Sequence, residues 1–560
     1  MAEILRIDNI SFRYFGRTNE ALKNINLRIN ENEIVLLAGR SGSGKSSLLR
    51  VINGLIPFFY RGDFSGQIFF YDEDITHIPP RERTKKGMAT VLQFPEDQIL
   101  ARKVWRAVAF GLANLGFSRE EIIKRVKEAL KCVDMWSFWD YDTLALSAGQ
   151  KQKIVLAAAL AIQPHLLLLD EPTSQLDPAS AQRFLISLKI IREELGMTII
   201  VAEHRFDELS TVADRVILID DGRIVANDPP RKIFATELPG KLGIGYPKLA
   251  LLTRFLAPDS NVFLGLEELK NELRRRNCVI QRIDKESKRA HPKGSRHAIV
   301  LDDVWFAYDG EWVLKGFSLS IREGSFVALM GPNGAGKTTL LKLIACIHKP
   351  VKGQVFLFSK STNNLRLKDV VGLVGYMPQN PEEIFFNKTV YDEIAFGLRM
   401  QGIKENEVRR RVHAIAKFLR IDHLLEENPF ALSGGEKLRV ALASVLILDP
   451  KILLFDEPTR GIDWETKLSF LSNIKQLVHT RTIVLATHDV ELLAELDVND
   501  VIVLNDGRVV LTGNKREVLS NPAIEKYGLV RPKITYLMKS LGAEGIVSIN
   551  EALKSIRCLK

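Results

Sequence analysis

Two glycine-rich stretches of this sequence have the composition and spacing of a loop that binds phosphate. Residues 39–46 read GRSGSGKS and residues 331–338 read GPNGAGKT. Each follows an apolar run typical of a buried strand and precedes a helical pattern, which is the context this loop requires. Glycines let consecutive backbone N–H groups surround an anion, and the helix N-terminus adds a positive dipole end. The sequence therefore predicts two P-loops.

The side chains of these loops are suited to a nucleoside triphosphate with Mg²⁺. Lys45 and Lys337 are expected to neutralise the β- and γ-phosphates, and the hydroxyls of Ser46 and Thr338 to ligate the cation. The predicted nucleotide-binding residues of the loops are Gly39, Ser41, Gly42, Gly44, Lys45, Ser46 and Ser47, and Gly331, Asn333, Gly334, Gly336, Lys337, Thr338 and Thr339.

Downstream of each loop, an apolar run ends in two carboxylates and a proline. The runs are LLLLDEP at 166–172 and ILLFDEP at 452–458. The C-terminal end of a strand is where such sheets bind ligands. Asp170 and Asp456 are expected to hold Mg²⁺, and Glu171 and Glu457 to polarise the attacking water. A single Asp-Glu-Pro is a common turn, but its repetition behind each P-loop favours catalysis.

The chemical motifs recur at one offset, which indicates an internal duplication. The offset is 292 residues between Lys45 and Lys337 and 286 residues between Asp170 and Asp456. Motifs of different chemistry keep this spacing within a few residues, so a domain of about 230 residues occurs twice.

Strand and helix patterns alternate within each copy, which predicts an α/β fold with a largely parallel sheet. In the first copy, residues 102–165 are mostly helical by period, and the second copy runs from about 297 to 520. The expected strands are 4–10, 22–29, 33–38, 66–78, 86–93, 165–169, 197–202, 214–219 and 223–227, and the clearest helices are 119–132, 151–162 and 178–195.

A shorter segment follows each copy and also looks duplicated. Residues 242–275 and 528–557 both read as glycine, proline, helix, loop and helix, and a polar segment separates the first from the second copy. The predicted boundaries are 1–238 for the first domain, 239–276 for its helical extension, 277–297 for a linker, 298–522 for the second domain and 523–560 for its extension.

Composition limits the surroundings in which the chain works. The 560 residues carry a formal net charge of +10, which is compatible with nucleic acid, an anionic membrane surface or no specific partner. The four cysteines are far apart and form no CxxC pair, which disfavours disulfides, zinc and iron–sulfur clusters and suits a reducing cytosol. We expect neither a signal peptide nor a membrane span, so work at a membrane would need a second chain to supply the span.

A third motif precedes each carboxylate pair and identifies a family. Residues 146–150 read LSAGQ and residues 432–436 read LSGGE, a serine and small residues at a helix N-terminus, suited to a phosphate. Here the chain resembles the ATP-binding-cassette (ABC) ATPases over nearly its whole length. The resemblance implies two tandem P-loop NTPase domains, each a RecA-like mixed sheet plus a helical subdomain, and ATP hydrolysis with ATP and Mg²⁺ as cofactors.

The resemblance also implies roles for residues that composition alone would leave structural. Their types match aromatic, glutamine, aspartate and histidine positions of the family's motifs. Tyr14 and Tyr308 would stack on adenine, Gln93 and Gln379 would contact Mg²⁺ and sense a membrane partner, Asp177 and Asp463 would cross between domains, and His204 and His488 would contact the γ-phosphate.

In this family two cassettes close head-to-tail, so each P-loop faces the other half's signature. Ser433 and Gly435 would complete the first site, and Ser147 and Gly149 the second. A covalent tandem makes this pairing intramolecular and raises its effective concentration. Ala148 and Glu436 depart from the signature, and the extra methyl of Ala148 would slow its site. Both halves keep their glutamate and histidine, so both are predicted to hydrolyse ATP.

The stretch after each glutamine resembles the ATPases of energy-coupling factor (ECF) transporters. Residues 93–100 read QFPEDQIL and residues 379–386 read QNPEEIFF, followed by VAFG at 108–111 and IAFG at 394–397. The family pattern is Gln-Asn-Pro-acid-acid-Gln; Phe94 replaces its asparagine, and the second half lacks its final glutamine.

The ECF resemblance implies uptake of a vitamin or a transition-metal ion. A membrane-embedded coupling subunit would dock near Gln93 and Gln379, and a small membrane protein would capture the substrate. The chain would then lie peripherally on the cytoplasmic face of the membrane, with no direct nucleic-acid contact.

Two alternatives remain open. One is a soluble tandem ABC ATPase acting on ribosomes or other nucleic-acid assemblies, although neither an N-terminal cysteine-rich domain nor a long helical linker is evident. The other is the ATPase of another importer, such as one for sugars. The motifs do not name the transported compound, because the ATPase does not contact it.

Overall fold

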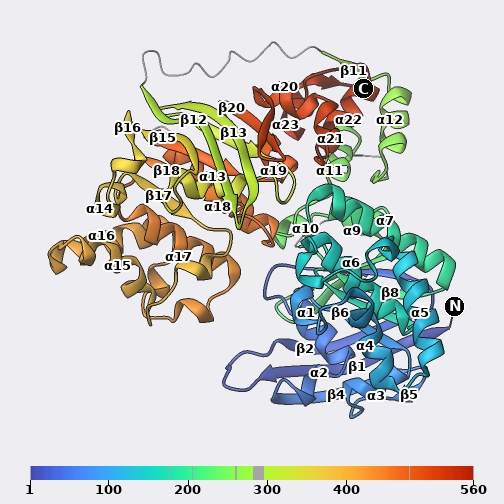
Figure 1. Cartoon of the computed structure of the whole chain (residues 1–560). Coiled ribbons are helices and arrows are strands. Elements are labelled where there is room, and N and C mark those ends of the chain that lie inside the picture. The colour runs from blue at the N-terminus through green and yellow to red at the C-terminus, as the bar shows by residue number, and fades with distance from the viewer. Residues whose placement is uncertain are drawn as a thin grey trace. The chain divides into compact units, whose positions relative to one another are not determined.

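The computed structural model describes residues 2–558 except 175, 205, 259–260, 282–295 and 479, and only the backbone of Phe206 and Leu367. The chain divides into two compact units, 1–269 and 270–560 (Figure 1). This division falls inside helix α12 (Leu266–Arg275), whereas the sequence placed boundaries at 238 and 276. Part of the expected linker is ordered, and the rest of it lies outside the described residues. Each unit is described by itself below.

A six-stranded sheet of order β10-β9-β3-β8-β7-β6 forms the centre of the first unit. All neighbouring pairs are parallel except β9 with β10. Every residue of β3, β7 and β8 is buried, as expected for parallel strands covered on both faces. The strands are β3 (Ile34–Ala38), β6 (Met88–Val91), β7 (Leu166–Asp170), β8 (Thr198–Ala202), β9 (Arg215–Asp220) and β10 (Arg223–Asp228).

Each face of this sheet belongs to a different hydrophobic core. Ile34 and Leu36 of β3 point into a core made with the long helices, while Val35 and Leu37 point into a core shared with an antiparallel sheet and α1. The helices of this unit that precede its tail are α1 (Lys45–Ile52), α2 (Leu55–Phe58), α3 (Pro80–Lys85), α4 (Val104–Leu115), α5 (Arg119–Cys132), α6 (Ala148–Ala161), α7 (Pro178–Leu195), α8 (Phe206–Leu209), α9 (Pro230–Ala235) and α10 (Leu238–Lys241), with 3-10 turns at Pro95–Asp97, Trp136–Phe138 and Thr143–Ala145.

The antiparallel sheet has the order β2-β1-β4-β5. The prediction of one strand over 66–78 is wrong, because the chain turns at Tyr71 and Asp72, which both have positive φ. Such a turn matches the twist of a hairpin. The strands are β1 (Glu3–Tyr14), β2 (Leu22–Asn30), β4 (Gly62–Phe70) and β5 (Glu73–Asp74).

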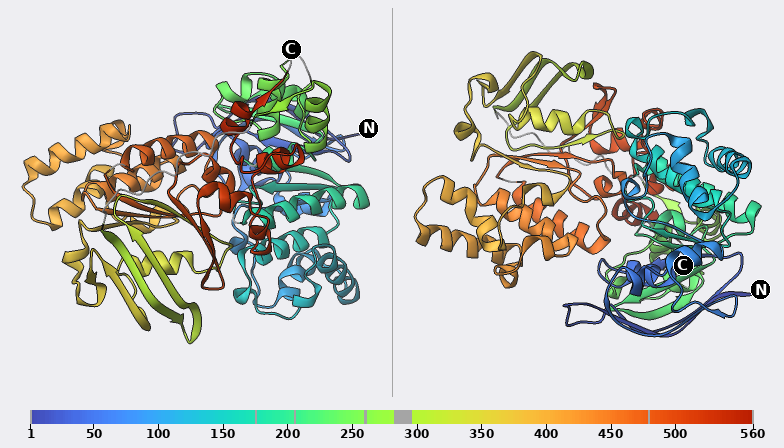
Figure 2. Two further views of the ribbon diagram at one scale, coloured as in Figure 1. Left: turned by 90° about the horizontal axis from the view of Figure 1, so that it is seen from above. Right: turned by 60° about the horizontal axis from the view of Figure 1, so that its bottom comes forward.

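The second unit repeats this architecture. Its sheets have the orders β17-β18-β19-β14-β20-β21 and β13-β12-β15-β16, and its helices α15 to α17 lie to one side of the sheets (Figure 2). The strands are β12 (His297–Tyr308), β13 (Glu311–Arg322), β14 (Phe326–Met330), β15 (Lys352–Leu357), β16 (Lys360–Ser361), β17 (Val374–Met377), β18 (Ile452–Asp456), β19 (Thr482–Ala486), β20 (Asp500–Asn505) and β21 (Arg508–Gly513). The helices that precede its tail are α13 (Lys337–Ile344), α14 (Leu367–Val370), α15 (Val390–Met400), α16 (Glu405–Phe418), α17 (Gly434–Leu446), α18 (Trp464–Leu477), α19 (Val490–Ala494), α20 (Lys515–Ser520) and α21 (Ala523–Lys526), with 3-10 turns at Thr362–Asn364, Pro381–Ile384, Asp422–Leu424 and Pro429–Ala431.

The two tails each contain a pair of helices, as their patterns predicted. The first tail holds α11 (Lys248–Leu256) and α12, and the second holds α22 (Lys533–Ser540) and α23 (Ile549–Ser555). The predicted fold class is confirmed: two tandem α/β P-loop domains, each with a helical subdomain and a helical extension.

The expectation that the cysteines form no disulfide is wrong. Cys278 is bonded to Cys558, 280 residues away, within the second unit. Strand β11 (Val279–Ile280) pairs antiparallel with β22 (Ile556–Arg557) and brings the two sulfurs together. Sequence spacing could not indicate this pair, because the contact depends on how the ends of the second unit fold back on each other.

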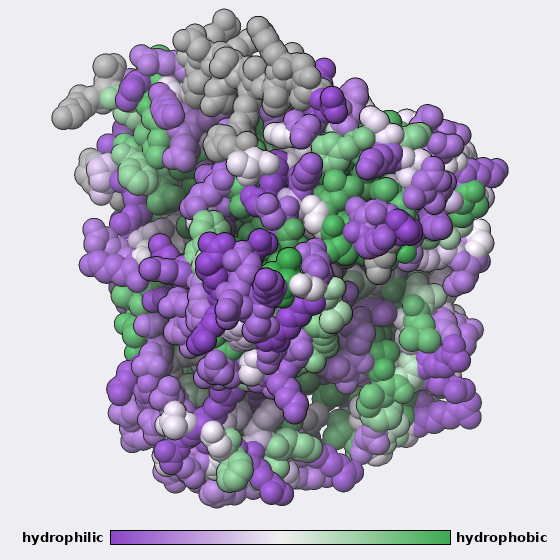
Figure 3. All heavy atoms as spheres, turned by 90° about the vertical axis from the view of Figure 1, so that its left-hand side faces the viewer, coloured by the Kyte–Doolittle hydropathy of each residue, from purple (hydrophilic) through white to green (hydrophobic). Residues whose placement is uncertain are grey.

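The exposed surface drawn in Figure 3 is mostly hydrophilic, with smaller hydrophobic groups between the polar residues. Among the helices of the described residues, none is both long and apolar enough to cross a bilayer.

Candidate nucleotide-binding sites

The first P-loop joins β3 to α1 through backbone that only glycine can supply. A Cβ at Gly39 would lie 2.3 Å from the carbonyl oxygen of Ile219. Gly44 has φ 110° and caps α1. Gly331 and Gly336 meet the same constraints in the second half. The loop tips, where Ser41, Gly42, Asn333 and Gly334 lie, are exposed to solvent.

The P-loop lysines are buried and curl over their own loops. Lys45 Nζ donates to the carbonyls of Gly39 and Arg40 at 2.8 and 2.9 Å. Lys337 Nζ makes the same bonds, at 2.8 and 3.0 Å, to the two corresponding carbonyls. Each loop thus holds a largely desolvated positive charge, which an anion would stabilise.

Hydroxyl and carboxylate oxygens converge behind each lysine. Ser46 Oγ donates to Asp170 Oδ1 at 2.9 Å, and Tyr376 donates to Asp456 Oδ2 at 3.2 Å. Asp456 is buried, and the hydroxyl of Thr338, which follows Lys337 at the start of α13, interacts with its carboxylate. Such oxygens are the ligands that Mg²⁺ prefers, so these residues fit a cation.

Burial changes the acidity of both aspartates. It raises the pKa of Asp170 and of Asp456, and the adjacent Glu171 and Glu457 raise each further. An ionised carboxylate is costly in such a setting, so a bound cation would stabilise it.

The first site brings its predicted glutamine, glutamate and histidine into contact. Glu171 Oε2 accepts from Gln93 Nε2 at 3.0 Å, and Glu171 Oε1 lies 3.1 Å from His204 Nε2. The backbone of Glu171 has φ 46°, an uncommon conformation that Glu457 shares with φ 44°. Each glutamate therefore adopts the same positive-φ conformation directly after a buried strand.

In the second site, the glutamate lies against a lysine and a histidine. Glu457 Oε1 lies 3.3 Å from Lys337 Nζ and Glu457 Oε2 lies 2.7 Å from His488 Nδ1. Burial alone would raise the pKa of Glu457, but His488 and Lys337 outweigh it and lower the pKa to about 2. This carboxylate is therefore ionised at neutral pH.

Gln379 makes a contact that sequence reasoning missed. Its side-chain amide oxygen accepts from the guanidinium of Arg460. Arg460 occupies the position that Ser174 holds in the first half, three residues after the glutamate. The sequence difference at this position, serine in the first half and arginine in the second, could have indicated that the two sites differ.

The two predicted adenine-stacking tyrosines have different partners. Tyr14 ends β1, and its hydroxyl lies 3.0 Å from Ser47 Oγ and accepts from Arg50. Tyr308 ends β12, and its hydroxyl lies 3.1 Å from His348 Nε2. Tyr14 thus contacts the helix that follows its P-loop, whereas His348 lies beyond the end of α13. Thr339, in the first turn of α13, is buried.

The signature and crossing residues all begin helices. Ser147 and Ser433 cap α6 and α17 with capping boxes, and Asp177 and Asp463 cap α7 and α18. Gly149 and Gly435 lie in the first turns of α6 and α17, and a Cβ at Gly435 would come within 2.9 Å of a threonine hydroxyl on α18. These positions have a structural function that requires no nucleotide.

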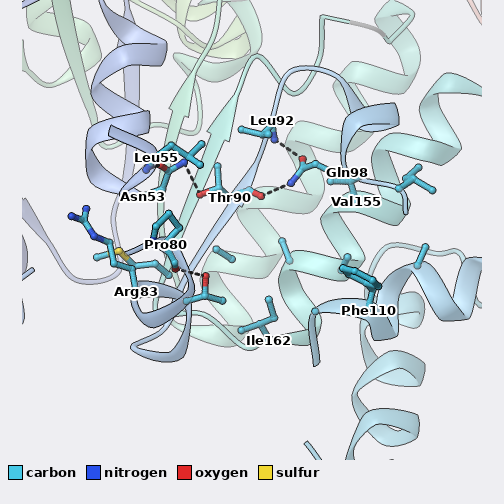
Figure 4. A pocket seen from close by; sticks show the side chains of 18 of the residues that line it. Asn53, Leu55, Pro80, Arg83, Thr90, Leu92, Gln98, Phe110, Val155 and Ile162 are labelled. Carbon is cyan, nitrogen blue, oxygen red and sulfur yellow. Dashed lines mark hydrogen bonds between the residues drawn. The ribbon is translucent and has the colours of Figure 1, made fainter. Parts of the chain in front are cut away.

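A pocket of about 320 Å³ is lined in part by Leu92, the residue before Gln93, and by residues of α4 and α6 (Figure 4). Its walls are mostly apolar, and Gln98 is fixed in it: Oε1 accepts from Leu92 N at 2.7 Å and Nε2 donates to Thr90 O at 3.0 Å. The remaining walls include Leu55, Pro80, Arg83, Ala107, Phe110, Val155, Ala158 and Ile162.

These sites define a P-loop ATPase with two nucleotide-binding domains. The family model described as "ABC transporter" matches residues 22–174 and 314–460. The chain therefore belongs to the ABC transporter family, as an ATP-binding protein with two fused cassettes that hydrolyses ATP.

Named relatives match this chain over most of their own length. The chain is 36% identical to a "Putative ABC transporter ATP-binding protein" of Methanosarcina acetivorans, over 98% of this chain and 91% of that protein. It is 34% identical to the "Putative HMP/thiamine import ATP-binding protein YkoD" of Bacillus subtilis, over 94% of each. A solved structure of CbiO1 from Clostridium perfringens, described as part of the ABC transporter complex CbiONQ, covers 44% of this chain and 96% of its own at 32% identity, with a TM-score of 0.39.

Proposed function

We propose that this chain is the ATP-hydrolysing subunit of an ECF-type importer for a vitamin or a transition-metal ion. The observation that carries the proposal is a largely apolar pocket whose wall includes Leu92. Leu92 directly precedes Gln93, and Gln93 donates a hydrogen bond to Glu171, the expected catalytic base. A relative of nearly equal length is named for HMP/thiamine import, and the residues after Gln93 and Gln379 resemble those of ECF ATPases.

Each ATP site would be formed by both halves. Lys45 and Ser46 would hold the phosphates and cation of the first ATP, and Ser433 and Gly435 would close over its γ-phosphate. Lys337 and Thr338 would pair in the same way with Ser147 and Gly149. Helix N-termini suit this purpose, because their N–H groups and dipole favour a phosphate.

In each site the glutamate would accept a proton from the attacking water. Glu457 is suited to this because it is ionised and held at both oxygens. His204 and His488 contact the glutamates and would orient the water and the γ-phosphate. Asp170 and Asp456 would hold Mg²⁺, whose positive charge would offset the negative charge of the phosphates.

The partner at the pocket would be a short apolar helix of a membrane-embedded coupling subunit. The pocket is lined by small and apolar side chains, and Phe94, Leu100 and Phe110 at and near its edge are exposed. Its wall residue Leu92 directly precedes Gln93, so an occupant would press on the residue that contacts Glu171. An equivalent segment would dock near Gln379.

In this proposal the chain lies peripherally on the cytoplasmic face of the membrane. The coupling subunit and a small capture protein would supply the membrane spans and the substrate site. ATP would favour the paired form of the two halves, and this closure would be transmitted to the coupling subunit.

The test is affinity purification of the tagged chain from gently solubilised native membranes, followed by mass spectrometry. We expect one hydrophobic coupling protein and one or more small multi-span proteins. Ribosomal proteins without a membrane partner would instead support a soluble ABC ATPase, and large permeases without small capture proteins would indicate another importer.

A pocket variant sharpens this test. Ala158→Arg places a long cation in the pocket, whereas Ala113→Arg adds the same side chain to the exposed side of α4. We expect only Ala158→Arg to lose the membrane partners while both keep ATPase activity in detergent. Equal recovery of partners by both variants would contradict docking at this pocket.

A further inference from the structure

Arg83 of α3 is a buried cation with an unusual set of partners. It is 1% exposed, and every partner in its hydrogen bonds is a main-chain carbonyl. Nε donates to Ile78 at 2.8 Å, Nη1 to Val51 at 2.7 Å and Ile52 at 2.8 Å, and Nη2 to Ile75 at 2.6 Å and Thr76 at 3.1 Å.

Two of these bonds secure the end of the P-loop helix. Val51 and Ile52 are the last residues of α1, and Lys45 and Ser46 are its first. The last carbonyls of a helix have no partner inside the helix and carry its negative dipole end, so a guanidinium suits them. Burial lowers the pKa of Arg83 to about 10, which leaves it charged at neutral pH.

The same residue forms part of the pocket wall. The side chain of Arg83 lines the pocket, and its guanidinium points away from it (Figure 4). Asn53 and Leu55, which follow α1 directly, line the pocket as well. Asn53 Nδ2 lies 3.4 Å from Thr90 Oγ1 on β6. One wall of the pocket is therefore the far end of the helix whose start forms the P-loop.

The second half has a different residue at this position. Strands β6 and β17 correspond, since each is parallel to the strand that ends in the catalytic carboxylates. This match aligns Arg83 with Asp369. The Asp369 carboxylate is 38% exposed and accepts from the backbone N–H of Arg366. A carboxylate cannot donate to helix carbonyls, so the aligned residue of the second half cannot make this link to its P-loop helix.

We propose that Arg83 is a positioning residue that couples the pocket to the first P-loop, so that a docked partner acts on the first ATP site more strongly than on the second. The proposal deepens the docking function above and rests on it for the identity of the occupant. The eight residues of α1 form a rigid rod of about 12 Å. A displacement of Arg83 by an occupant therefore shifts Lys45 and Ser46.

The link can be measured on the purified full-length chain without any membrane partner. Amide hydrogen exchange of residues 75–86, the segment that contains Arg83 and most of its carbonyl partners, is measured with and without MgADP. We expect nucleotide to slow this exchange in the wild-type chain and not in Arg83→Met. Arg81→Met is the matched control, because Arg81 lies on the same helix, is exposed and donates to Asn114 O.

Site-specific affinity separates positioning from a merely structural role. In a Lys337→Ala chain, Arg83→Met should weaken MgADP binding about tenfold, since bonds that hold the helix end are lost. In a Lys45→Ala chain, the same substitution should leave the affinity of the second site unchanged. Arg83→Lys, which keeps the charge and one donor group, should give an intermediate loss.

Several outcomes would overturn the proposal. They are an absence of nucleotide-dependent protection at residues 75–86 in the wild type, equal protection in Arg83→Met, or equal losses of affinity at both sites. The wild-type measurement decides the matter even if Arg83→Met does not fold. A positive result combined with no membrane partner in the purification would reject the transporter proposal and leave this coupling standing.

Discussion

Lys337 Nζ lies 3.3 Å from Glu457 Oε1, and both side chains are buried. The ammonium expected to bind the triphosphate is thus paired with the carboxylate expected to activate water. The pair must open before Lys337 can hold a phosphate, so binding and catalysis compete for the same charge in the second site.

Glu457→Gln should separate these two effects. The substitution leaves Lys337 buried without its counter-charge, which a phosphate would then supply, so ATP affinity should rise about tenfold while turnover at this site is lost. Fluorescent-nucleotide titration in a Lys45→Ala chain measures the affinity. Weaker binding would contradict the competition.

The equivalent substitution Glu171→Gln tests whether both sites hydrolyse ATP. We expect each single substitution to lower turnover. If Glu457→Gln abolished turnover while Glu171→Gln left it intact, the prediction of two active sites would be wrong.

Asp456→Asn should stabilise the nucleotide-free protein at neutral pH. Burial raises the pKa of Asp456, so between its unfolded and folded pKa the native state binds more protons and stability falls as pH rises. The amide mimics the protonated form and avoids this loss, so Tm at pH 7.5 should increase by a few degrees.

The same variant should respond less to MgATP, because a cation ligand is missing. Thermal unfolding from pH 4 to pH 8, with and without MgATP, checks both expectations. Two results would contradict these expectations: a lower Tm of the variant without nucleotide, or a Tm increase with MgATP as large as that of the wild type. Either would show that Asp456 is not a destabilised carboxylate that binds the cation.

Glu436→Gln should strengthen the site that this signature completes. Ser433 Oγ and N both contact Glu436 Oε2, at 2.6 and 2.9 Å, which sets a negative charge where the γ-phosphate is expected. Glutamine keeps the capping box, as Gln150 does in the first half. We expect KM for ATP to fall about fivefold, corresponding to the upper end of an exposed charge interaction.

The reciprocal substitution Gln150→Glu is the control and should raise KM at the other site. Steady-state ATPase assays in chains with one P-loop lysine replaced resolve the two sites. Unchanged KM in both variants would count against pairing of each P-loop with the opposite signature.

Cys278→Ser should destabilise the second unit. The disulfide to Cys558 closes a loop of 280 residues, and loss of such a link typically costs about 2–5 kcal/mol. Denaturant unfolding of the wild type with and without reductant should reproduce the loss, while Cys132→Ser, which removes a free exposed thiol, should not. The chain has four cysteines. If all four thiols could be alkylated before reduction, the disulfide would be shown not to form in the protein.

Much of the fold could be read from local patterns. The helices expected at 119–132 and 178–195 match α5 and α7, because apolar spacing, caps and glycine stops act within a few residues. The split of β4 from β5 was missed, since Tyr71 and Asp72 are unusual at positive φ and give no turn signal of the Asn-Gly kind.

The residues expected in the sites could also be named in advance, because each motif is a short string whose chemistry requires specific side chains. What the strings could not show is their partners. Gln93 contacts Glu171, whereas Gln379 contacts Arg460, although the two glutamines occupy equivalent positions. Such differences depend on one neighbour that lies far away in sequence.

By itself, the sequence determined a duplicated P-loop ATPase and its family, and it named candidate catalytic residues, since all of these depend on glycines, charges and spacing within short segments. Only the tertiary structure decided that Arg83 secures the end of α1, that Lys337 pairs with Glu457 and that Cys278 bonds to Cys558. Each of these is a contact between segments distant along the chain, and burial gives such contacts their strength by removing the water that would otherwise satisfy the same groups.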